Sequence, residues 1–267
     1  MPELAEVEFY RKQWNSGLGR KIVAVQLHAD KRIFLGADTR ALRTLLPGTV
    51  LRNSEARGKQ MLFRFSRDLW LGLHLGMTGT LRTEKRGFTP ARHDHLVLTQ
   101  AGRMLVFADP RQFGRVLFHH GPDVPQWWAK LPPPVTSPAF TVAGMESFLR
   151  RHGRLPLKAA LLLQQGFPGI GNWMADEILW RTRLHPRTLA ERIDGEAMRQ
   201  LWRKVRWVSR GALAIIGKDW SDPPKGWLIH ERWTGNGVCP LHKTKLARAT
   251  IGGRTTAWCE RCQAARP

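Results

Sequence analysis

The strongest constraint on the fold is a change of hydrophobic pattern at a proline-rich segment in the middle of the chain. Between about residues 20 and 120, short apolar runs alternate with turn residues such as Arg67-Asp68 and Ala101-Gly102. Short strands at this spacing are typical of a sandwich or barrel. Beyond Leu131-Pro-Pro-Pro134 the apolar residues recur every three or four positions, which indicates helices. The expected strands are Ile22–His28, Met61–Phe65, Leu69–Leu75, His95–Leu98 and Met104–Phe107.

Two helices are indicated in more detail. Residues Glu3–Asn15 have the spacing of a short helix that ends before Gly17. A long helix is expected to begin after Asp194 as N-cap and to stop at Gly217. Its apolar face would consist of Met198, Leu201, Val205, Val208, Ala212 and Ile215.

The charge balance points to a polyanionic partner. The 267 residues include 43 Lys and Arg against 21 Asp and Glu, a net charge of +22. Such a surplus opposes compaction unless nucleic acid is the usual partner. A hydrophobic fraction of 42% and 12 Trp exclude a disordered basic tail. We expect neither a membrane span nor a secretion signal, because the apolar runs are short and the first residues are acidic.

The cysteines predict a metal site at the C-terminal end. Cys239 and His242 are separated by two residues, sixteen residues follow, and Cys259 and Cys262 form a second pair with the same gap. Two such pairs complete the tetrahedral shell of one structural Zn²⁺. The alternatives are His230 in place of His242, or three unrelated free cysteines. Between the pairs, Leu246–Trp258 would form a hairpin with Ile251-Gly-Gly-Arg254 at its tip.

Three further segments carry a family resemblance. They are Met1-Pro-Glu-Leu-Ala-Glu-Val-Glu8, Arg57-Gly-Lys59, and Gly169-Ile-Gly-Asn-Trp-Met-Ala-Asp-Glu-Ile-Leu-Trp180 with His185-Pro186 after it. Together with the cysteine pattern, the chain resembles the formamidopyrimidine-DNA glycosylase and endonuclease VIII family of base-excision repair enzymes. The resemblance implies an α+β fold: an N-terminal β-sandwich with an N-terminal helix, then a helical helix–two-turns–helix domain with a C-terminal zinc finger. DNA would run across the cleft between the two domains. The implied ranges are 1–130 for the sandwich, 131–140 for a linker, 141–230 for the helical domain and 231–267 for the finger.

The chain start would carry the chemistry. After removal of Met1, Pro2 presents a secondary amine, and α-amino groups have a pKa near 8, so part of the population is neutral and nucleophilic. The resemblance implies that Pro2 attacks the sugar C1′, that Glu3 moves protons at the sugar, and that Lys59 contacts a phosphate and assists. Glu6 would be a supporting or structural acid. Read alone, Pro2 would only permit removal of Met1, and Glu3 would only favour a helix start. Ala5 departs from the family, which usually has a second proline there.

Other residues would hold and open the DNA. The glycines of Gly166–Gly171 and the helix that begins at Asn172 favour a phosphate clamp made by Gly171, Asn172 and the preceding amides, supported by Lys158. The alternative is an ordinary connection between helices. The resemblance implies that Arg254 grips phosphates. It also implies that Met77 fills the stack left by the flipped base, Phe113 wedges the duplex and Arg111 pairs with the orphaned base.

The predicted function is therefore a bifunctional DNA glycosylase and AP lyase for oxidised purines such as 8-oxoguanine, opposite cytosine. Its partner would be double-stranded DNA with damaged bases or abasic sites, and the protein would be monomeric, cytoplasmic and nucleoid-associated. An endonuclease VIII-like enzyme for oxidised pyrimidines and a catalytically inactive damage-binding protein are alternatives. A zinc-ribbon ribosomal or transcription module would leave the N-terminal motif unexplained. The role of the loop 218–226 stays open.

Overall fold

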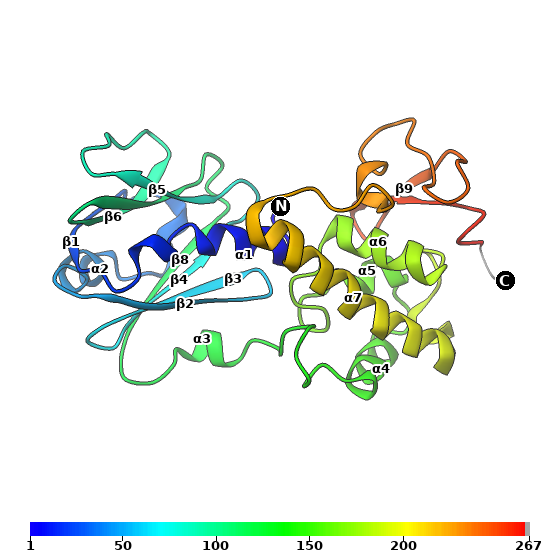
Figure 1. Ribbon diagram of the computed structural model, residues 1–267. Coiled ribbons are helices and arrows are strands. Elements are labelled where there is room, and N and C mark those ends of the chain that lie inside the picture. Colours follow the sequence, from blue (N-terminus) through cyan, green and yellow to red (C-terminus); the bar gives the residue numbers. More distant parts are fainter. Residues whose placement is uncertain (265–267) are drawn as a thin grey trace. The chain divides into compact units, whose positions relative to one another are not determined.

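The structure is a computed structural model that describes residues 1–264; residues 265–267, the end of the predicted finger, lie outside the described residues. The chain divides into two compact units (Figure 1). The first contains Met1–Pro2 and Glu6–Leu131, and the second contains Glu3–Ala5 and Pro132–Pro267. The finer division of the second part into linker, helical domain and finger remains a prediction.

The first unit contains two antiparallel sheets, with strand orders β1-β6-β7-β5 and β2-β3-β4-β8. Apolar residues of both sheets share one core, which includes Phe63 from β3 and Phe107 from β7. This arrangement is the predicted sandwich. Its elements are α1 Leu4–Lys12, β1 Ile22–Leu27, α2 Thr39–Leu45, β2 Leu51–Arg57, β3 Gln60–Phe65, β4 Leu69–His74, β5 Thr80–Lys85, β6 Asp94–Gln100, β7 Arg103–Ala108, β8 Arg115–His120 and α3 Gln126–Ala129, with short 3₁₀ turns at Asn15–Gly17 and Arg32–Phe34.

Turn chemistry sets the register of the first unit's hairpins. Gly58 takes a φ of +60° at the first of two turn positions between β2 and β3, as a type II′ turn requires, and Lys59 occupies the second. Arg67 and Asp68 both have positive φ in the predicted turn between β3 and β4. Lys59 therefore lies at a hairpin tip.

Three strands and two helices, α2 and α3, of this unit were not predicted. Strands β2, β5 and β8 lie at sheet edges and are rich in polar residues. An edge strand needs no continuous apolar face, so its sequence lacks a strong alternating pattern. Helix α2 has only one buried residue, Leu42.

The second unit is built from helices and one small hairpin around its own core. Its elements are α4 Val142–Arg151, α5 Leu157–Leu161, α6 Asn172–Thr182, α7 Gly195–Asp219, β9 Ala247–Ile251 and β10 Arg254–Trp258, with 3₁₀ turns at Ala190–Arg192 and Leu228–His230. Val135 and Phe140, from the segment predicted as a linker, are buried in this core. Within the described residues, none of the helices has the length and apolar character needed to cross a bilayer.

The structure confirms the start of the long helix and corrects its end. The Asp194 side chain accepts a hydrogen bond from Ala197 N at 2.7 Å, as expected of an N-cap. The helix does not stop at Gly217 but continues to Asp219, where Trp220 adopts the left-handed conformation that ends it. Ile216, rather than Ile215, completes the buried face. The first N-terminal helix ends earlier than predicted, at Lys12.

Candidate functional site

The N-terminus of α6 holds the carboxylate of Glu3. Oε2 of Glu3 accepts hydrogen bonds from Gly171 N at 2.8 Å and from Met174 N at 3.2 Å, and Oε1 accepts one from Trp173 N at 2.9 Å. Free amides and the helix dipole make a helix N-terminus an anion site, and here a side chain of the same chain occupies it. Glu3 is 2% exposed, so its carboxylate has one fixed position.

Neighbouring backbone contacts fix this arrangement. Leu4 N donates to Gly169 O at 3.0 Å, and Gly169 has a φ of +90° that favours glycine. The Gln164 side chain bonds the backbone of Leu162, Gly169 and Ile170, which shapes the turn before α6. Among the glycines predicted to approach phosphate, Gly171 therefore binds Glu3 with its amide instead.

Gly171 has no room for a side chain, so we expect Gly171→Ala to lower the stability. A Cβ there would lie 2.4 Å from Glu3 Cδ, which must move. Overpacking of this kind costs about 1–3 kcal/mol of unfolding free energy. Gly195→Ala is the matched control, because its Cβ would meet no atom closer than 3.7 Å. Urea unfolding of both variants tests this; equal stabilities would contradict the Glu3 geometry.

Lys59 lies beside the first residue of the chain. Its Nζ is 3.9 Å from Met1 Sδ, while Met1 is half-exposed and Pro2 is partly buried.

Burial, and secondly the Lys59 charge, lower the pKa of His74. His74 Nδ1 accepts a hydrogen bond from Gly76 N at 3.0 Å, as a neutral imidazole can. Glu6, half-buried on α1, adds to burial in raising the pKa of Tyr10.

Two loops of the first unit bring together the residues predicted to open DNA. Met77 lies between β4 and β5 and is partly buried, whereas Arg111 and Phe113 are exposed between β7 and β8. The Arg111 guanidinium carbon lies 4.8 Å from the Phe113 ring centre. The two loops touch closely, because a Cβ on Gly76 would lie 2.3 Å from the Phe113 carbonyl carbon.

Asp109 links these two loops and was not identified from the sequence. Its Oδ1 accepts from Thr78 Oγ1 at 2.8 Å and its Oδ2 from Gly114 N at 2.6 Å. The carboxylate is fully buried. It therefore holds the segment after Met77 against the segment after Phe113.

A second buried carboxylate, Asp176, joins the helices to the C-terminal hairpin. It accepts from Lys158 Nζ at 2.5 Å, from Arg232 Nη2 at 2.7 Å and from Ala257 N at 3.2 Å. Lys158 also donates to Asn172 O at 2.6 Å. Burial lowers the pKa of Lys158, and the charge of Asp176 opposes this shift.

The placement of Lys158 differs from the predicted phosphate contact. Its side chain has no exposed surface, because Asp176 draws the ammonium into the interior of the second unit. Asn172, in contrast, lies at the start of α6 and donates from Nδ2 to Thr255 O at 3.0 Å. The structure thus brings Asn172 next to the hairpin that carries Arg254.

The hairpin of β9 and β10 matches the sequence expectation. Gly252 and Gly253 form its two-residue turn, both with positive φ, and Arg254 is the exposed residue that follows. A Cβ on Gly252 would lie 2.8 Å from Ala159 Cβ, so the tip rests on α5.

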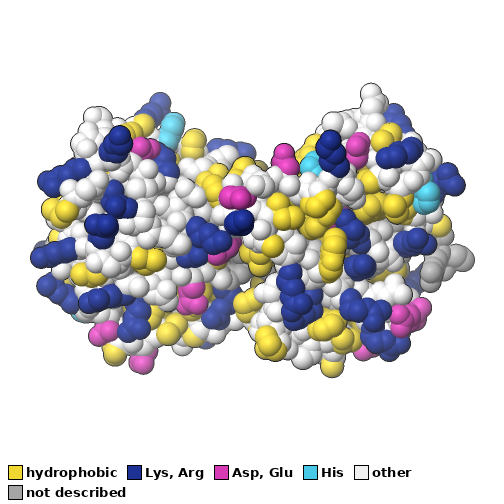
Figure 2. Space-filling view, viewed as in Figure 1, with side chains coloured by type: hydrophobic (Ala, Val, Ile, Leu, Met, Phe, Trp, Pro, Cys, Tyr) yellow, Lys and Arg dark blue, Asp and Glu magenta, His cyan; other side chains and the backbone are white. Residues whose placement is uncertain are grey.

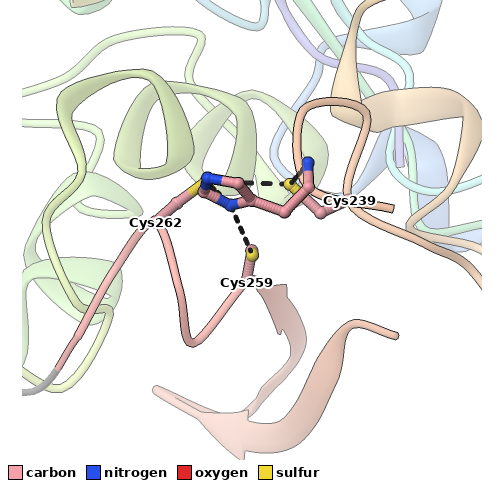
Figure 3. Close-up of side chains that lie close together, drawn as sticks. Cys239, Cys259 and Cys262 are labelled. Carbon is pink, nitrogen blue, oxygen red and sulfur yellow. Dashed lines mark hydrogen bonds between the residues drawn. The ribbon is translucent and has the colours of Figure 1, made fainter. Parts of the chain in front are cut away.

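The predicted metal ligands form one cluster. The ligand atoms of Cys239, His242, Cys259 and Cys262 all lie within 4.8 Å of one another, and Figure 3 shows the three cysteines converging. Cys239 Sγ is 3.7 Å from Cys262 Sγ, and His242 Nδ1 is 3.2 Å from Cys262 Sγ and 3.6 Å from Cys259 Sγ. Ligand atoms around a tetrahedral ion with bonds of about 2.3 Å lie roughly 3.7 Å apart, so the residues fit a metal ion. His230 does not belong to this cluster, and its Nε2 is hydrogen-bonded to Pro223 O at 2.7 Å.

Glu177 predicts a pH-dependent stability. Burial raises its pKa to about 7, outweighing the ion pair with Arg181 Nε at 2.6 Å. Between about pH 4.5 and 7 the folded protein keeps a proton that the unfolded chain has released, so the unfolding free energy falls as the pH rises. The loss across this window is about 3 kcal/mol. In urea titrations at pH 5, 6 and 7.5, the unfolding free energy of the wild type should fall with rising pH, and that of Glu177→Gln should not show this fall. The same dependence on pH in both proteins would contradict the assignment to Glu177.

Comparison with known proteins agrees with this architecture. Residues 1–116 match the family model of the formamidopyrimidine-DNA glycosylase N-terminal domain, and residues 131–222 match that of the formamidopyrimidine-DNA glycosylase H2TH domain. The formamidopyrimidine-DNA glycosylases of Laribacter hongkongensis and Thermus thermophilus are each 33% identical to this chain. The first alignment covers 98% of this chain, the second covers 100% of it, and both cover the whole of the relative. The chain belongs to the formamidopyrimidine-DNA glycosylase family.

Solved structures of relatives have the same fold. One is Lactococcus lactis formamidopyrimidine-DNA glycosylase bound non-covalently to DNA containing an abasic site, with a TM-score of 0.86 and 25% identity over 98% of this chain and all of that one. Another is MutM in complex with DNA containing carbocyclic 8-oxoguanine, with a TM-score of 0.87 and 26% identity over 99% of this chain and all of that one.

Proposed function

We propose that this chain is a bifunctional DNA glycosylase and AP lyase that removes oxidised purines from double-stranded DNA. The observation that carries the proposal is the fixed carboxylate of Glu3, the residue directly after Pro2, which three amides at the N-terminal end of α6 hold in place. Membership of the family and the names of its relatives support this reaction and an oxidised-purine substrate. The structures of relatives with abasic or 8-oxoguanine DNA support damaged DNA as the partner.

The reaction begins at the amine of Pro2, once Met1 has been removed. The nitrogen lone pair attacks C1′ of the damaged nucleotide, and the bond from C1′ to the base breaks with its electron pair leaving on the base. The amine proton then passes to the sugar O4′, and the C1′–O4′ bond breaks, which leaves an iminium ion between Pro2 and C1′. The iminium withdraws electrons and acidifies the C2′ proton, so elimination expels the 3′ phosphate and cleaves the strand. While Met1 is attached, the Pro2 nitrogen is an amide without a reactive lone pair.

Glu3 and Lys59 assist this amine in the proposal. Glu3 exchanges protons with the sugar from one fixed position. Lys59, beside Met1 at a hairpin tip, places a cation where a phosphate or leaving group carries negative charge. Glu6 supports the α1 environment near the amine.

Two further groups of residues would grip and open the duplex. Met77, Arg111 and Phe113 replace and sense the flipped base, with Asp109 holding their loops together. Asn172 and Arg254 bind phosphates, and Gly171 supports Asn172 by letting Glu3 reach the start of α6. Lys158 acts from inside, through Asn172 O and Asp176, rather than by touching DNA.

We propose that the Cys/His cluster binds one structural Zn²⁺. Three thiolates and one imidazole in a closed, mostly buried cluster are a typical structural zinc set. The ion would stabilise the finger that presents Arg254. We also propose that the enzyme acts as a monomer and that its DNA substrate places it with the nucleoid in the cytoplasm.

The identity of the base that the protein releases distinguishes this proposal from the alternative functions. Purified protein is incubated with duplexes that carry 8-oxoguanine opposite cytosine or thymine glycol, and the free bases are quantified. We expect release of 8-oxoguanine and its loss in Pro2→Gly, because glycine replaces the secondary ring amine. Release of thymine glycol alone would favour the pyrimidine enzyme. No release and no strand cleavage would leave only a damage-binding protein.

A further inference from the structure

The outer face of α7 carries a basic stripe that the proposed function does not use. Between Ala197 and Lys218 the helix has six Lys or Arg and no Asp or Glu. The stripe consists of Arg199, Arg203, Trp207, Arg210 and Lys218, all exposed and spaced three, four or eight residues apart. This spacing places them on one side of the helix, opposite the buried face that begins at Met198. Figure 2 shows Lys and Arg side chains gathered over the part of the second unit where α7 runs.

A carboxylate partly balances the first end of this stripe. Glu196 pairs with Arg199 at 3.0 Å and with Arg203 at 3.3 Å, so one acid faces two guanidinium groups. Arg206, beside the stripe, donates to Ser137 O at 2.5 Å, a contact that leaves its positive charge uncompensated. Burial and the nearby Arg210 lower the pKa of Arg206, as expected where like charges are crowded.

An aromatic side chain is held in the middle of the stripe. Trp207 is 46% exposed, and its ring stacks on that of Trp227 with centroids 5.3 Å apart. The Arg181 guanidinium carbon lies 4.4 Å from the Trp207 ring centre and Lys204 Nζ lies 5.6 Å from it. The stacked indole holds these cations at the surface, where they can bind phosphate groups.

We propose that this stripe binds the phosphate backbone of a second segment of duplex DNA, distinct from the segment held at Asn172 and Arg254. From Arg199 to Arg210 the helix rises about 16 Å, the length over which one DNA strand presents about five phosphates. Arginine forks suit phosphate oxygens, which they can bind with two parallel hydrogen bonds. Trp207 of the stripe contacts Arg181 in the last turn of α6, whereas the proposed lesion site is at the first turn of that helix. Such a second contact keeps the enzyme on DNA and lets one molecule hold two segments.

The test compares two full-length triple variants with the wild type. The first is Arg199→Gln/Arg203→Gln/Arg210→Gln, in which glutamine keeps the helix propensity. The control, Arg40→Gln/Arg67→Gln/Lys85→Gln, removes the same charge from exposed positions of the first unit. Binding of an undamaged duplex is measured against salt concentration. In a second assay, the protein is first bound to an immobilised duplex, and its capture of a second, fluorescent duplex is then measured.

We expect the α7 variant to lose the captured second duplex and to bind duplex at least tenfold more weakly at low salt. Its plot of log affinity against log salt should be shallower by about 2 to 3, since each lost phosphate contact removes about 0.9 from the slope. The control should retain capture. Equal slopes in both variants, or a wild type that never captures a second duplex, would overturn the proposal. Cleavage of a short lesion duplex is assayed separately. If that cleavage fails, the proposed function is wrong, but the binding and capture results still test the stripe.

Discussion

Replacing Glu3 by glutamine should lower the rate of base release by at least 100-fold. A positioned acid or base contributes about 10²–10⁴ to a rate, and an amide can neither accept nor return a proton. Glutamine would also turn an NH₂ group toward the amides of Gly171, Trp173 and Met174, all of which need an acceptor. Loss of the charge-assisted hydrogen bonds should cost about 2 kcal/mol of unfolding free energy.

Single-turnover kinetics on an 8-oxoguanine duplex, with urea unfolding of the same samples, measure both effects. Glu55→Gln, which removes an exposed carboxylate from β2, is the matched control and should behave as wild type. A Glu3→Gln protein that is destabilised but releases base at the wild-type rate would show that Glu3 only anchors the chain start to α6.

Replacing Cys259 by alanine should remove the metal and the DNA affinity together. Three ligands cannot close the tetrahedral shell, and in small metal sites the binding energy of the ion is folding energy. The hairpin of β9 and β10 would then lose its attachment to the metal at residue 259, directly after Trp258. Arg254 would lose its fixed position as a result. We expect less than one tenth of the wild-type zinc content and at least tenfold weaker binding of abasic-site DNA.

Thr250→Ala, an exposed position on the same hairpin, controls for general damage to the finger. Zinc is quantified by atomic emission and DNA binding by fluorescence anisotropy. A Cys259→Ala protein that lacks zinc but binds DNA as tightly as the wild type would separate the finger from DNA recognition.

The sequence predicted those parts of the fold whose signals are local. The Cys239–Cys262 ligand pattern, the Asp194 cap and the Gly252-Gly253 turn are each fixed by spacing or by a backbone conformation that few residues adopt. The edge strands β2, β5 and β8 and the short helix α2 were missed, because an element that buries little needs no apolar periodicity.

The site depended on contacts that no local pattern carries. The sequence identified Glu3 and the start of α6 separately, but not that one binds the other across 168 residues. Asp109 and Asp176 were missed for the same reason, since a buried acid that links two loops looks like any other acid in the sequence. The burial of Lys158 follows from its pairing with Asp176, which only the fold brings within reach.

Identification of the amine that binds DNA tests the central claim most directly. The wild-type protein is incubated with a duplex containing an abasic site, reduced with borohydride, digested with protease and analysed by tandem mass spectrometry. The account predicts a single sugar adduct on the nitrogen of Pro2, in a peptide that begins with Pro2 because Met1 is gone. An adduct on a lysine such as Lys59, or trapped protein that still begins with Met1, would contradict it.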